Sequence, residues 1–491
     1  MAPSGYRNPV IPGFHPDPSV CRVGDDYYLV TSTFEYFPGV PLYHSRDLVH
    51  WRHLTNVLDR PEQLPLETAP SSGGIFAPTL RHHDGHFHMV TTNFWDLGNF
   101  VVTAGDPAGP WSDPVALEVP GIDPDLAWDD DGCIVTTSGI AQTRVDLATG
   151  RALGEPATTW SGTGLQFPEA PHLYRRGEWW YLMIAEGGTE RGHGVSIARS
   201  RRPDGPFEGC PGNPILSHRS TDRPIQNTGH ADLVELPDGS WWMVLLGVRP
   251  RGMTPAYHVM GRETFLVPVR WDHDWPVVEP VEPEYEAGPL PAAPWPDEPV
   301  RDDFDGDALH PRWLSVRRRR DQDWSLTDRP GWLTLHGGDH DMDDQLPVFV
   351  GRRQQHQQVA VTARVTIDGA TRAGLSVRMD ERHHFDVVIE DHHAVARYRV
   401  GDLGGEVGRA PVAGEPELGV RIEEPPPDFG MPPDQITATV DGEPIATVDG
   451  RYLSTDVASG FTGRVIGMFA VGGTAHFDWF DYTGTDSLED E

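Results

Sequence analysis

Short runs of apolar and aromatic residues, separated by turns rich in Gly and Pro, dominate the hydrophobic pattern of the chain. Segments such as 27–30, 179–183 and 241–244 have the length and the aromatic or β-branched composition of strands. Amphipathic helical periodicity is hard to find anywhere. The 53 Gly and 47 Pro residues are dispersed, which suits many short strands joined by tight turns. The pattern therefore predicts an all-β protein.

One sequence unit occurs five times in the first half of the chain. It is a tetrad that ends in an apolar residue, followed by a short spacer, a turn with Gly and an aromatic-rich strand. The residues that close the tetrads are Val20, Leu80, Leu126, Leu173 and Leu233. Successive copies are 60, 46, 47 and 60 residues apart, and each period fits one four-stranded blade. We expect residues 1–275 to form a five-bladed β-propeller, with an irregular all-β fold as the alternative.

The repeat ends after Trp275, where the composition changes. Residues 276–300 carry eight prolines among acidic and small residues, which predicts a stiff linker. Alternating apolar and polar positions then return without a repeat, for example over 359–365. Residues 301–491 are therefore predicted to form a lectin-like β-sandwich. Within it, 423–433 contains five prolines and is predicted to be a loop.

Charge and composition exclude several functions. The chain has 39 basic and 74 acidic residues, a net charge of −35, and every basic residue is Arg because the sequence contains no Lys. Schiff-base, PLP and P-loop lysine chemistry are therefore excluded. The acidic balance argues against nucleic acid and anionic membranes as partners. The one basic run, 317–320, is predicted to be a solvated strand or turn.

Little in the sequence indicates export or metal binding. The three cysteines (Cys21, Cys133 and Cys210) are too few and too scattered for a disulfide framework or a zinc site. Residues 1–13 lack a basic region followed by an apolar stretch, and no window approaches the length of a membrane span. We expect a cytoplasmic protein. Whether it forms a homo-oligomer is left open.

Candidate chemistry gathers where the tetrads begin. The first strand of each blade lines the channel of a propeller, so residues that open the tetrads are expected to converge. These residues and their neighbours are Asp17, Phe76–Ala77, Asp123, Glu169–Ala170 and Gly229–His230. Buried unpaired carboxylates are costly, so three of them together predict a function. Cleavage of a glycosidic bond needs two carboxyl groups in different protonation states. For Asp17 or Asp123 alone, capping a turn before Pro is the alternative.

Glu169 is offset by one residue from the register of Asp17 and Asp123. Because side chains alternate along a strand, it would point in another direction in a regular strand. A β-bulge would correct the offset, or the acid reaches the site from elsewhere.

A series of motifs, in order over residues 7–275, resembles glycoside hydrolase family 43. The segment 8–19 resembles the opening signature of the family. Further segments resemble its β-xylosidase branch: 32–40, 44–51, 72–78, 169–174, 185–189, 229–231 and 261–264. The second domain resembles the C-terminal β-sandwich of that branch at 302–304, 325–327 and 460–463.

The resemblance implies roles for the three acidic residues. Asp17 would be the general base that activates water, and Glu169 the general acid that protonates the leaving oxygen. Asp123 would orient Glu169 and raise its pKa. Inversion of configuration is implied, with base and acid about 6.5–9.5 Å apart. No cofactor is required, and a Ca²⁺ ion near His230 is left open.

The resemblance also implies contacts to the sugar. Arg262 would hydrogen-bond adjacent hydroxyls, with a structural salt bridge as the alternative. Phe34 and Phe76 would be apolar walls, and His230 would hold the floor of the site. Phe461 would reach over the pocket from the second domain and restrict action to chain ends, unless it is a core residue of the sandwich.

Three departures from the branch bear on substrate choice. Phe76 stands where Trp is common, 93–105 looks short, and 423–433 replaces a regular hairpin. The expected activity is that of an inverting exo-glycosidase releasing xylose from the non-reducing end of β-1,4-xylo-oligosaccharides. An α-L-arabinofuranosidase with the same site is the nearest alternative. A non-catalytic carbohydrate-binding propeller and a retaining fructosidase-like propeller are the others.

Overall fold

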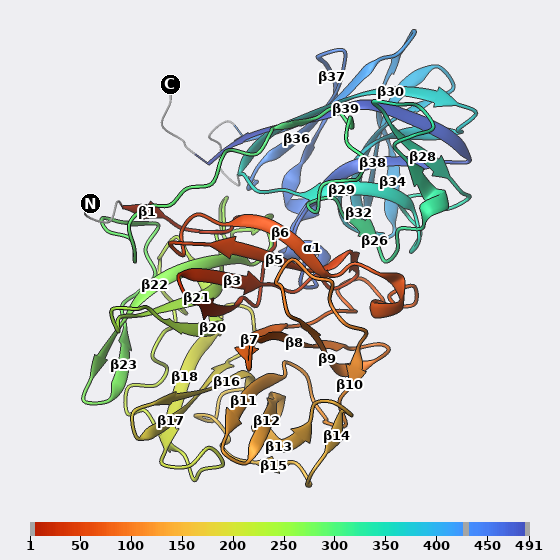
Figure 1. Ribbon diagram of the computed structural model, residues 1–491. Helices are drawn as coiled ribbons and strands as arrows, with labels where there is room; N and C mark the ends of the chain where they lie inside the picture. The colour runs from red at the N-terminus through yellow and green to blue at the C-terminus, as the bar shows by residue number, and fades with distance from the viewer. Residues whose placement is uncertain (1–4, 426–431, 487–491) are drawn as a thin grey trace.

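The computed structural model describes residues 5–425 and 432–486, and β-strands dominate it (Figure 1). Five antiparallel sheets follow one another along the chain, each with its strands in sequence order. The first blade contains β2 (Ser19–Val23), β3 (Asp26–Val30), β5 (Gly39–Ser45) and β6 (Arg52–Leu58), and the second contains β7 (Thr79–His83), β8 (His86–Asn93), β9 (Gly98–Ala104) and β10 (Val115–Ala116). The third contains β11 (Asp125–Asp129), β12 (Gly132–Thr137), β13 (Ala141–Asp146) and β14 (Arg151–Ala152), with β15 (Ala157–Thr158) beside β13. The fourth contains β16 (Glu169–Arg176), β17 (Trp179–Glu186), β18 (Gly194–Ser200) and β19 (Glu208–Gly209), and the fifth contains β20 (Gln226–Glu235), β21 (Trp241–Val248), β22 (Glu263–Asp272) and β23 (Trp275–Val278). The innermost strands contact one another in a ring that closes between β20 and β2.

Strands in the middle of a blade are apolar on both faces because each face packs against a neighbouring blade. All eight residues of β21 are buried. Trp241 and Met243 pack into the core shared with the fourth blade, whereas Trp242 and Val244 pack into the core shared with the first. The side-chain alternation of one strand thus joins two blades.

A buried polar network joins the innermost strands of the five blades. Arg81, from the second blade, donates to Asp232 at 2.8 Å and to Asp125 at 2.8 Å. Ser19 and Tyr174 donate to the same Asp232 carboxylate. Burial alone would raise the pKa of Asp232, but the charge of Arg81 outweighs it and the pKa lies well below its usual value. One guanidinium therefore bridges two buried carboxylates from different blades.

Two sheets form the second domain, which lies against one side of the propeller (Figure 1). The core between them is made of residues such as Leu375, Val377, Phe385 and Ile466. One sheet contains β27 (Trp324–Ser325), β28 (Leu333–Gly337), β39 (Gly473–Thr485), β30 (Gln358–Asp368), β35 (Glu417–Glu423), β36 (Gln435–Val440) and β37 (Glu443–Asp449), with β25 (Arg301–Asp302) beside β39. The other contains β29 (Val348–Arg353), β38 (Val465–Val471), β31 (Arg372–Asp380), β32 (His383–Glu390), β33 (His393–Val400) and β34 (Leu403–Pro411).

Helical structure is limited to short segments. The one α-helix of the described residues is α1 (Thr455–Ala458). The 3₁₀ turns are Pro61–Gln63, Ser138–Ile140, Asp321–Asp323 and Gly450–Leu453. No helix in the described part of the chain has the length and apolarity to cross a membrane. Most of the predicted 423–433 loop, from 426 to 431, lies outside the described residues.

The segment predicted as a linker runs along the propeller. Its first residues belong to β23, which completes the fifth blade and ends at Val278. β24 (Glu284–Tyr285) then pairs with β1 (Tyr6–Arg7) near the N-terminus. Further on, Trp295 donates to the carbonyl of His44 and stacks under Arg52. The Pro-rich chain is thus fastened to the first blade.

Strand pairing and buried polar contacts join the two domains. β4 (Tyr36–Phe37) of the propeller pairs with β26 (Ser315–Val316) of the second domain. The fully buried Arg378 donates to the Tyr36 hydroxyl at 3.1 Å and lies 3.9 Å from the Glu35 carboxylate. These contacts fix the second domain beside the residues that follow β3.

Arg317 corrects the prediction that 317–320 is a solvated run. Its side chain is fully buried, and its guanidinium donates to the carbonyls of Ala69 and Gln345 and to Glu381. The partners come from both domains, so this cation belongs to the interface between them. Arg320, at the end of the run, is exposed as predicted.

Candidate active site

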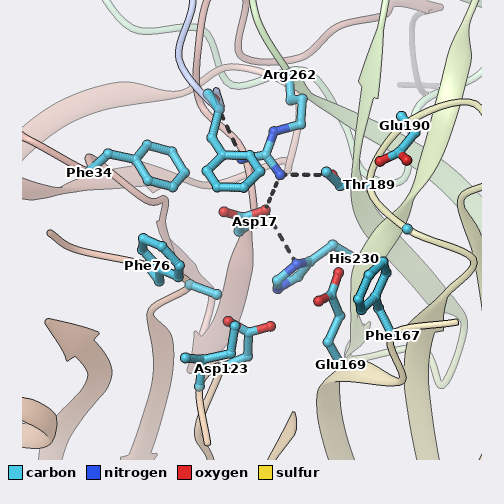
Figure 2. A pocket seen from close by; sticks show the side chains of 14 residues that line it. Asp17, Phe34, Phe76, Asp123, Phe167, Glu169, Thr189, Glu190, His230 and Arg262 are labelled. Carbon is cyan, nitrogen blue, oxygen red and sulfur yellow. Dashed lines mark hydrogen bonds and ion pairs between the residues drawn. The ribbon is translucent and has the colours of Figure 1, made fainter. Parts of the chain in front are cut away.

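One pocket of about 250 Å³ opens where the innermost strands of the propeller begin (Figure 2). Every residue predicted for the site lines it: Asp17, Phe34, Phe76, Asp123, Glu169, His230, Arg262 and Phe461. The structure therefore brings together side chains from all five blades and one from the second domain. Their chemical roles remain predictions at this point.

The backbone around the pocket departs from regular strand geometry to present these side chains. Asp17 and Asp123 each stand two residues before an innermost strand, with φ of 57° and 54°. Asp tolerates this left-handed region better than most residues. Glu169 is the first residue of β16, and a bulge follows it, with Ala170 at φ 51°. The bulge is the correction that the one-residue offset of Glu169 required.

Asp17 lies at the bottom of the pocket, and its side chain is only 6% exposed. Ser32 donates to its Oδ2 at 2.6 Å, and Arg262 Nη1 donates to its Oδ1 at 3.2 Å. Burial by itself would raise the pKa of Asp17. The charge of Arg262 and the Ser32 hydrogen bond outweigh burial, and the pKa of Asp17 lies below its usual value. Asp17 is therefore ionised, as a general base must be.

Glu169 has the opposite electrostatic environment. Burial raises its pKa to about 7, the negative charges of Asp17 and Glu190 add to the rise, and Arg262 opposes it. Near neutral pH a large fraction of Glu169 thus carries the proton that a general acid donates. The two carboxyl groups of the predicted pair differ in protonation because only Asp17 touches Arg262 and Ser32.

Asp123 lies beside Glu169 at the floor of the pocket (Figure 2). It accepts a hydrogen bond from the Ala170 amide at 3.3 Å, next to Glu169 in the chain. Burial, then the charges of Glu169 and Asp17, raise the pKa of Asp123 well above its usual value. The repulsion between the two carboxyl groups is mutual, so it acts on Glu169 as well, beside burial and the charge of Asp17. The orienting role of Asp123 stays a prediction, supported by its bond to Ala170.

Arg262 and two aromatic rings form the upper wall of the pocket. Arg262 donates to Thr189 Oγ1 at 2.9 Å and to the carbonyl of Phe461, and its guanidinium lies over the rings of Phe34 and Phe461. Arg262 forms the salt bridge to Asp17 and also lines the pocket, so a structural salt bridge is compatible with the predicted contact to the sugar. Phe461 contacts both Phe34 and Phe76, and it is not a core residue of the sandwich.

His230 closes the floor next to Asp17, with its Nδ1 3.3 Å from Asp17 Oδ1. Burial lowers the pKa of His230 to about 3, so the imidazole is neutral. No group of three or more His, Cys, Asp or Glu in residues 5–425 and 432–486 is arranged to hold a metal ion. The Ca²⁺ ion near His230 that the sequence leaves open stays a prediction.

Five lining residues were not predicted, and they are Ile122, Phe167, Gly188, Thr189 and Glu190. Thr189 belongs to the 185–189 motif, but nothing in the sequence distinguished its hydroxyl from the rest of that motif. Phe167 precedes Glu169 by two residues, and this proximity is the one sequence signal that could have identified it as a neighbour of the acid. Glu190 lies on the loop between β17 and β18, which has no counterpart among the tetrads.

An ionised base and a protonated acid around a pocket the size of a sugar ring define the active site of a glycoside hydrolase. The chain belongs to glycoside hydrolase family 43. Residues 6–276 match the model for glycosyl hydrolases family 43, and residues 301–483 match that of the beta xylosidase C-terminal Concanavalin A-like domain. These matches confirm the predicted class of enzyme and the predicted fold, a propeller followed by a sandwich.

Curated proteins of similar sequence have two kinds of activity in their names. A non-reducing end alpha-L-arabinofuranosidase of Bacteroides ovatus is 42% identical, over 98% of this chain and 95% of that protein. A xylan 1,3-beta-xylosidase of Vibrio sp is 34% identical, over 97% of this chain and 98% of that protein. Pentose-releasing glycosidases of both kinds are thus similar to this chain along nearly its whole length.

Solved structures agree with the fold. The GH43B protein of a Bacteroides ovatus xyloglucan PUL has a TM-score of 0.92 at 40% identity, covering 98% of this chain and 100% of that one. A xylan beta-1,4-xylosidase from Bacillus halodurans has a TM-score of 0.90 at 34% identity, covering 97% of this chain and 100% of that one. Both domains and their mutual arrangement are therefore shared with these proteins.

The protonation states of the pair predict the pH dependence of kcat/KM. The acid must be protonated, so activity falls as pH rises through about 7, the pKa of Glu169. The base must be ionised, so the acidic limb lies below the ordinary Asp value of 3.8. Glu190→Gln removes one charge that raises the pKa of Glu169, and the basic limb should move to lower pH. The pH profiles of kcat/KM for the wild type, for Glu190→Gln and for the remote control variant Asp238→Asn measure this shift. A basic limb unmoved by Glu190→Gln would contradict it.

Proposed function

We propose that the chain is an inverting exo-glycosidase that releases xylose from the non-reducing end of β-1,4-xylo-oligosaccharides. The observation that carries the proposal is the convergence of an ionised Asp17 and a raised-pKa Glu169 on one small pocket. Its volume of about 250 Å³ is below the roughly 300–1,000 Å³ of pockets for drug-sized ligands. A pocket of this size, walled by Phe461, suits a single terminal sugar ring.

In the mechanism, each of the two carboxyl groups transfers one proton. Asp17 takes a proton from a water molecule, whose oxygen attacks the anomeric carbon. Glu169 donates its proton to the glycosidic oxygen as the bond to the anomeric carbon breaks, and the shortened oligosaccharide leaves as an alcohol. A β-xyloside therefore yields α-xylose. Proton exchange with solvent restores ionised Asp17 and protonated Glu169.

The other lining residues hold the terminal sugar in place for this step. Arg262 presents its guanidinium to sugar hydroxyls while it keeps Asp17 ionised. Phe34, Phe76 and Phe461 form a continuous apolar wall through ring contacts, and aromatic faces of this kind suit the apolar side of a sugar ring. The neutral His230 lies against Asp17 without adding a charge.

An α-L-arabinofuranosidase is the second candidate function. The 42% identity to the Bacteroides ovatus arabinofuranosidase supports it, as does Phe76 in place of the Trp common in the β-xylosidase branch. Both substrates carry a pentose, so the same acid, base and Arg262 serve either. A retaining mechanism and a non-catalytic binding role are the remaining alternatives.

Initial rates on 4-nitrophenyl β-D-xylopyranoside and 4-nitrophenyl α-L-arabinofuranoside separate the candidates. We expect faster turnover of the xylopyranoside, with α-xylose as the first product by proton NMR, and xylose and xylotriose as the first products from xylotetraose. A higher kcat/KM for the arabinofuranoside would assign the second candidate. First-formed β-xylose would indicate retention, and turnover of neither compound would indicate a binding protein.

Location, assembly and cation binding stay predictions. We propose the cytoplasm as the location, since a chain with three cysteines too scattered for a disulfide framework suits a reducing compartment. A homo-oligomer is testable by light scattering. Calcium near His230 is testable by titration calorimetry with CaCl₂, and no catalytic step above requires it.

A further inference from the structure

The position of the acid determines where the leaving group must lie. Glu169 protonates the oxygen that joins the terminal sugar to the rest of the substrate, so the next sugar sits directly beyond Glu169. In Figure 2, Phe167, Glu169 and Glu190 line one side of the pocket, and Phe34 and Phe76 line the other. The side chains nearest the leaving sugar are therefore Phe167 and Glu190.

Phe167 is an unusual residue for a surface loop. It lines the pocket, yet 62% of its surface is exposed, and its backbone has φ 52°. A bulky residue rarely adopts this left-handed conformation, and such strain concentrates at functional sites. Burial in a core does not explain this phenylalanine because most of its ring faces solvent. A ligand ring at the mouth of the pocket would cover it.

Hydrogen bonds on both sides hold Phe167 in place. The carbonyl of Gln166 accepts from the Gly187 amide at 2.8 Å, and its side-chain amide donates to the Gly187 carbonyl at 3.1 Å. On the other side, the carbonyl of Pro168 accepts from the Gly139 amide at 2.8 Å. The exposed ring is thus presented by a fixed backbone, which lowers the entropic cost of stacking on a sugar.

Glu190 adds hydrogen-bonding capacity beside the ring. It lies on the loop that Gln166 ties to Phe167, lines the same pocket and is exposed. A carboxylate accepts hydrogen bonds from sugar hydroxyls, and an aromatic face packs on the apolar face of the same ring. The pair therefore offers the two kinds of contact that a pyranose needs.

We propose that Phe167 and Glu190 form the subsite for the leaving-group sugar, a neutral pyranose joined to the terminal pentose. This subsite rests on the proposed glycosidase function and specifies which part of the substrate it recognises beyond the terminal sugar. Because the next sugar contacts Phe167 only while it is linked to the substrate, the subsite raises kcat/KM for oligosaccharides over small glycosides.

Phe167→Ala tests the subsite by comparing xylobiose with β-D-xylopyranosyl fluoride, whose leaving group is a single atom. We expect kcat/KM for xylobiose to fall about tenfold while that for the fluoride stays within about twofold, since one ring contact is lost. Phe167→Trp should restore most of the activity on xylobiose. If the wild type prefers arabinofuranosides, the same comparison uses an arabinofuranosyl-xylose disaccharide and arabinofuranosyl fluoride.

Trp95→Ala is the matched control. Trp95 is 54% exposed and contacts Phe94, which stacks on Phe76 on the opposite side of the pocket. Its removal should leave both rates unchanged. Equal losses on xylobiose and fluoride in Phe167→Ala, or a selective loss on xylobiose in Trp95→Ala, would overturn the subsite while leaving the glycosidase intact. A wild type that hydrolyses neither substrate would instead overturn the proposed function and the subsite with it.

Discussion

Glu169→Gln is expected to lose about 10²–10⁴-fold in kcat on xylobiose, the usual contribution of a general acid. The same variant should keep most of its activity on β-D-xylopyranosyl fluoride. Fluoride leaves without protonation, so its departure does not need the proton that Glu169 carries because of its raised pKa. The amide retains the size of the side chain, which limits the change in the pocket. Steady-state kinetics on both substrates measure the contrast.

Asp17→Asn provides the complementary result. Without the base, water is not activated, so we expect about 10²–10⁴-fold losses on xylobiose and on the fluoride alike. Loss on both substrates in Asp17→Asn, and on xylobiose alone in Glu169→Gln, distinguishes base from acid. If Glu169→Gln lost both activities equally, the role of Glu169 as acid would have to be abandoned. Both variants should bind xylose, which confirms that the pocket is intact.

Arg81→Met is expected to reduce the free energy of unfolding by about 3–5 kcal/mol, the cost of leaving buried carboxylates without their cation. The carboxylates are Asp125 and Asp232, whose side chains are 1% and 0% exposed. Met fills a similar volume, so the loss reflects charge rather than a cavity. Urea unfolding followed by near-ultraviolet circular dichroism measures the change.

A matched variant separates this effect from the loss of any arginine. Arg46 pairs with Asp26 at 3.4 Å, and its side chain is 59% exposed. Arg46→Met should cost no more than about 1 kcal/mol, because exposed ion pairs contribute little. Similar losses in the two variants would show that the central network is not a main source of stability.

The five-bladed architecture was predictable because each blade starts with a similar tetrad. The same tetrads also carry residues of the central polar network, which was not predicted from the sequence. Their third positions are all polar, and they are Ser19, Thr79, Asp125, His172 and Asp232. Four of them, Ser19, Asp125, His172 and Asp232, meet Arg81 in the central network. Arg81 itself lies outside the tetrad and occurs in one blade only, so no repeat pointed to it.

The site was predictable where it follows the repeat and not where it depends on loops. Asp17 and Asp123 open their tetrads and Glu169 directly precedes its own, although only the structure shows that the bulge after Glu169 turns it inward. Phe167 and Glu190 come from loops with no counterpart in other blades. The burial of Arg317 also escaped prediction, because its partners Ala69, Gln345 and Glu381 are distant in sequence. The limits of the domains, predicted at 275 and 301, stay a prediction.

Phe461 is held in the pocket by the propeller itself. Its backbone amide donates to Ser72 Oγ at 2.8 Å, and the Ser72 amide donates to the Glu35 carboxylate at 2.9 Å. Glu35 in turn faces Arg378 of the second domain. The catalytic module is thus incomplete by itself, and exchanging the C-terminal module for that of another enzyme would open one wall of the sugar site. Evolution toward internal cleavage of long polymers would have a direct route through the loss of this module.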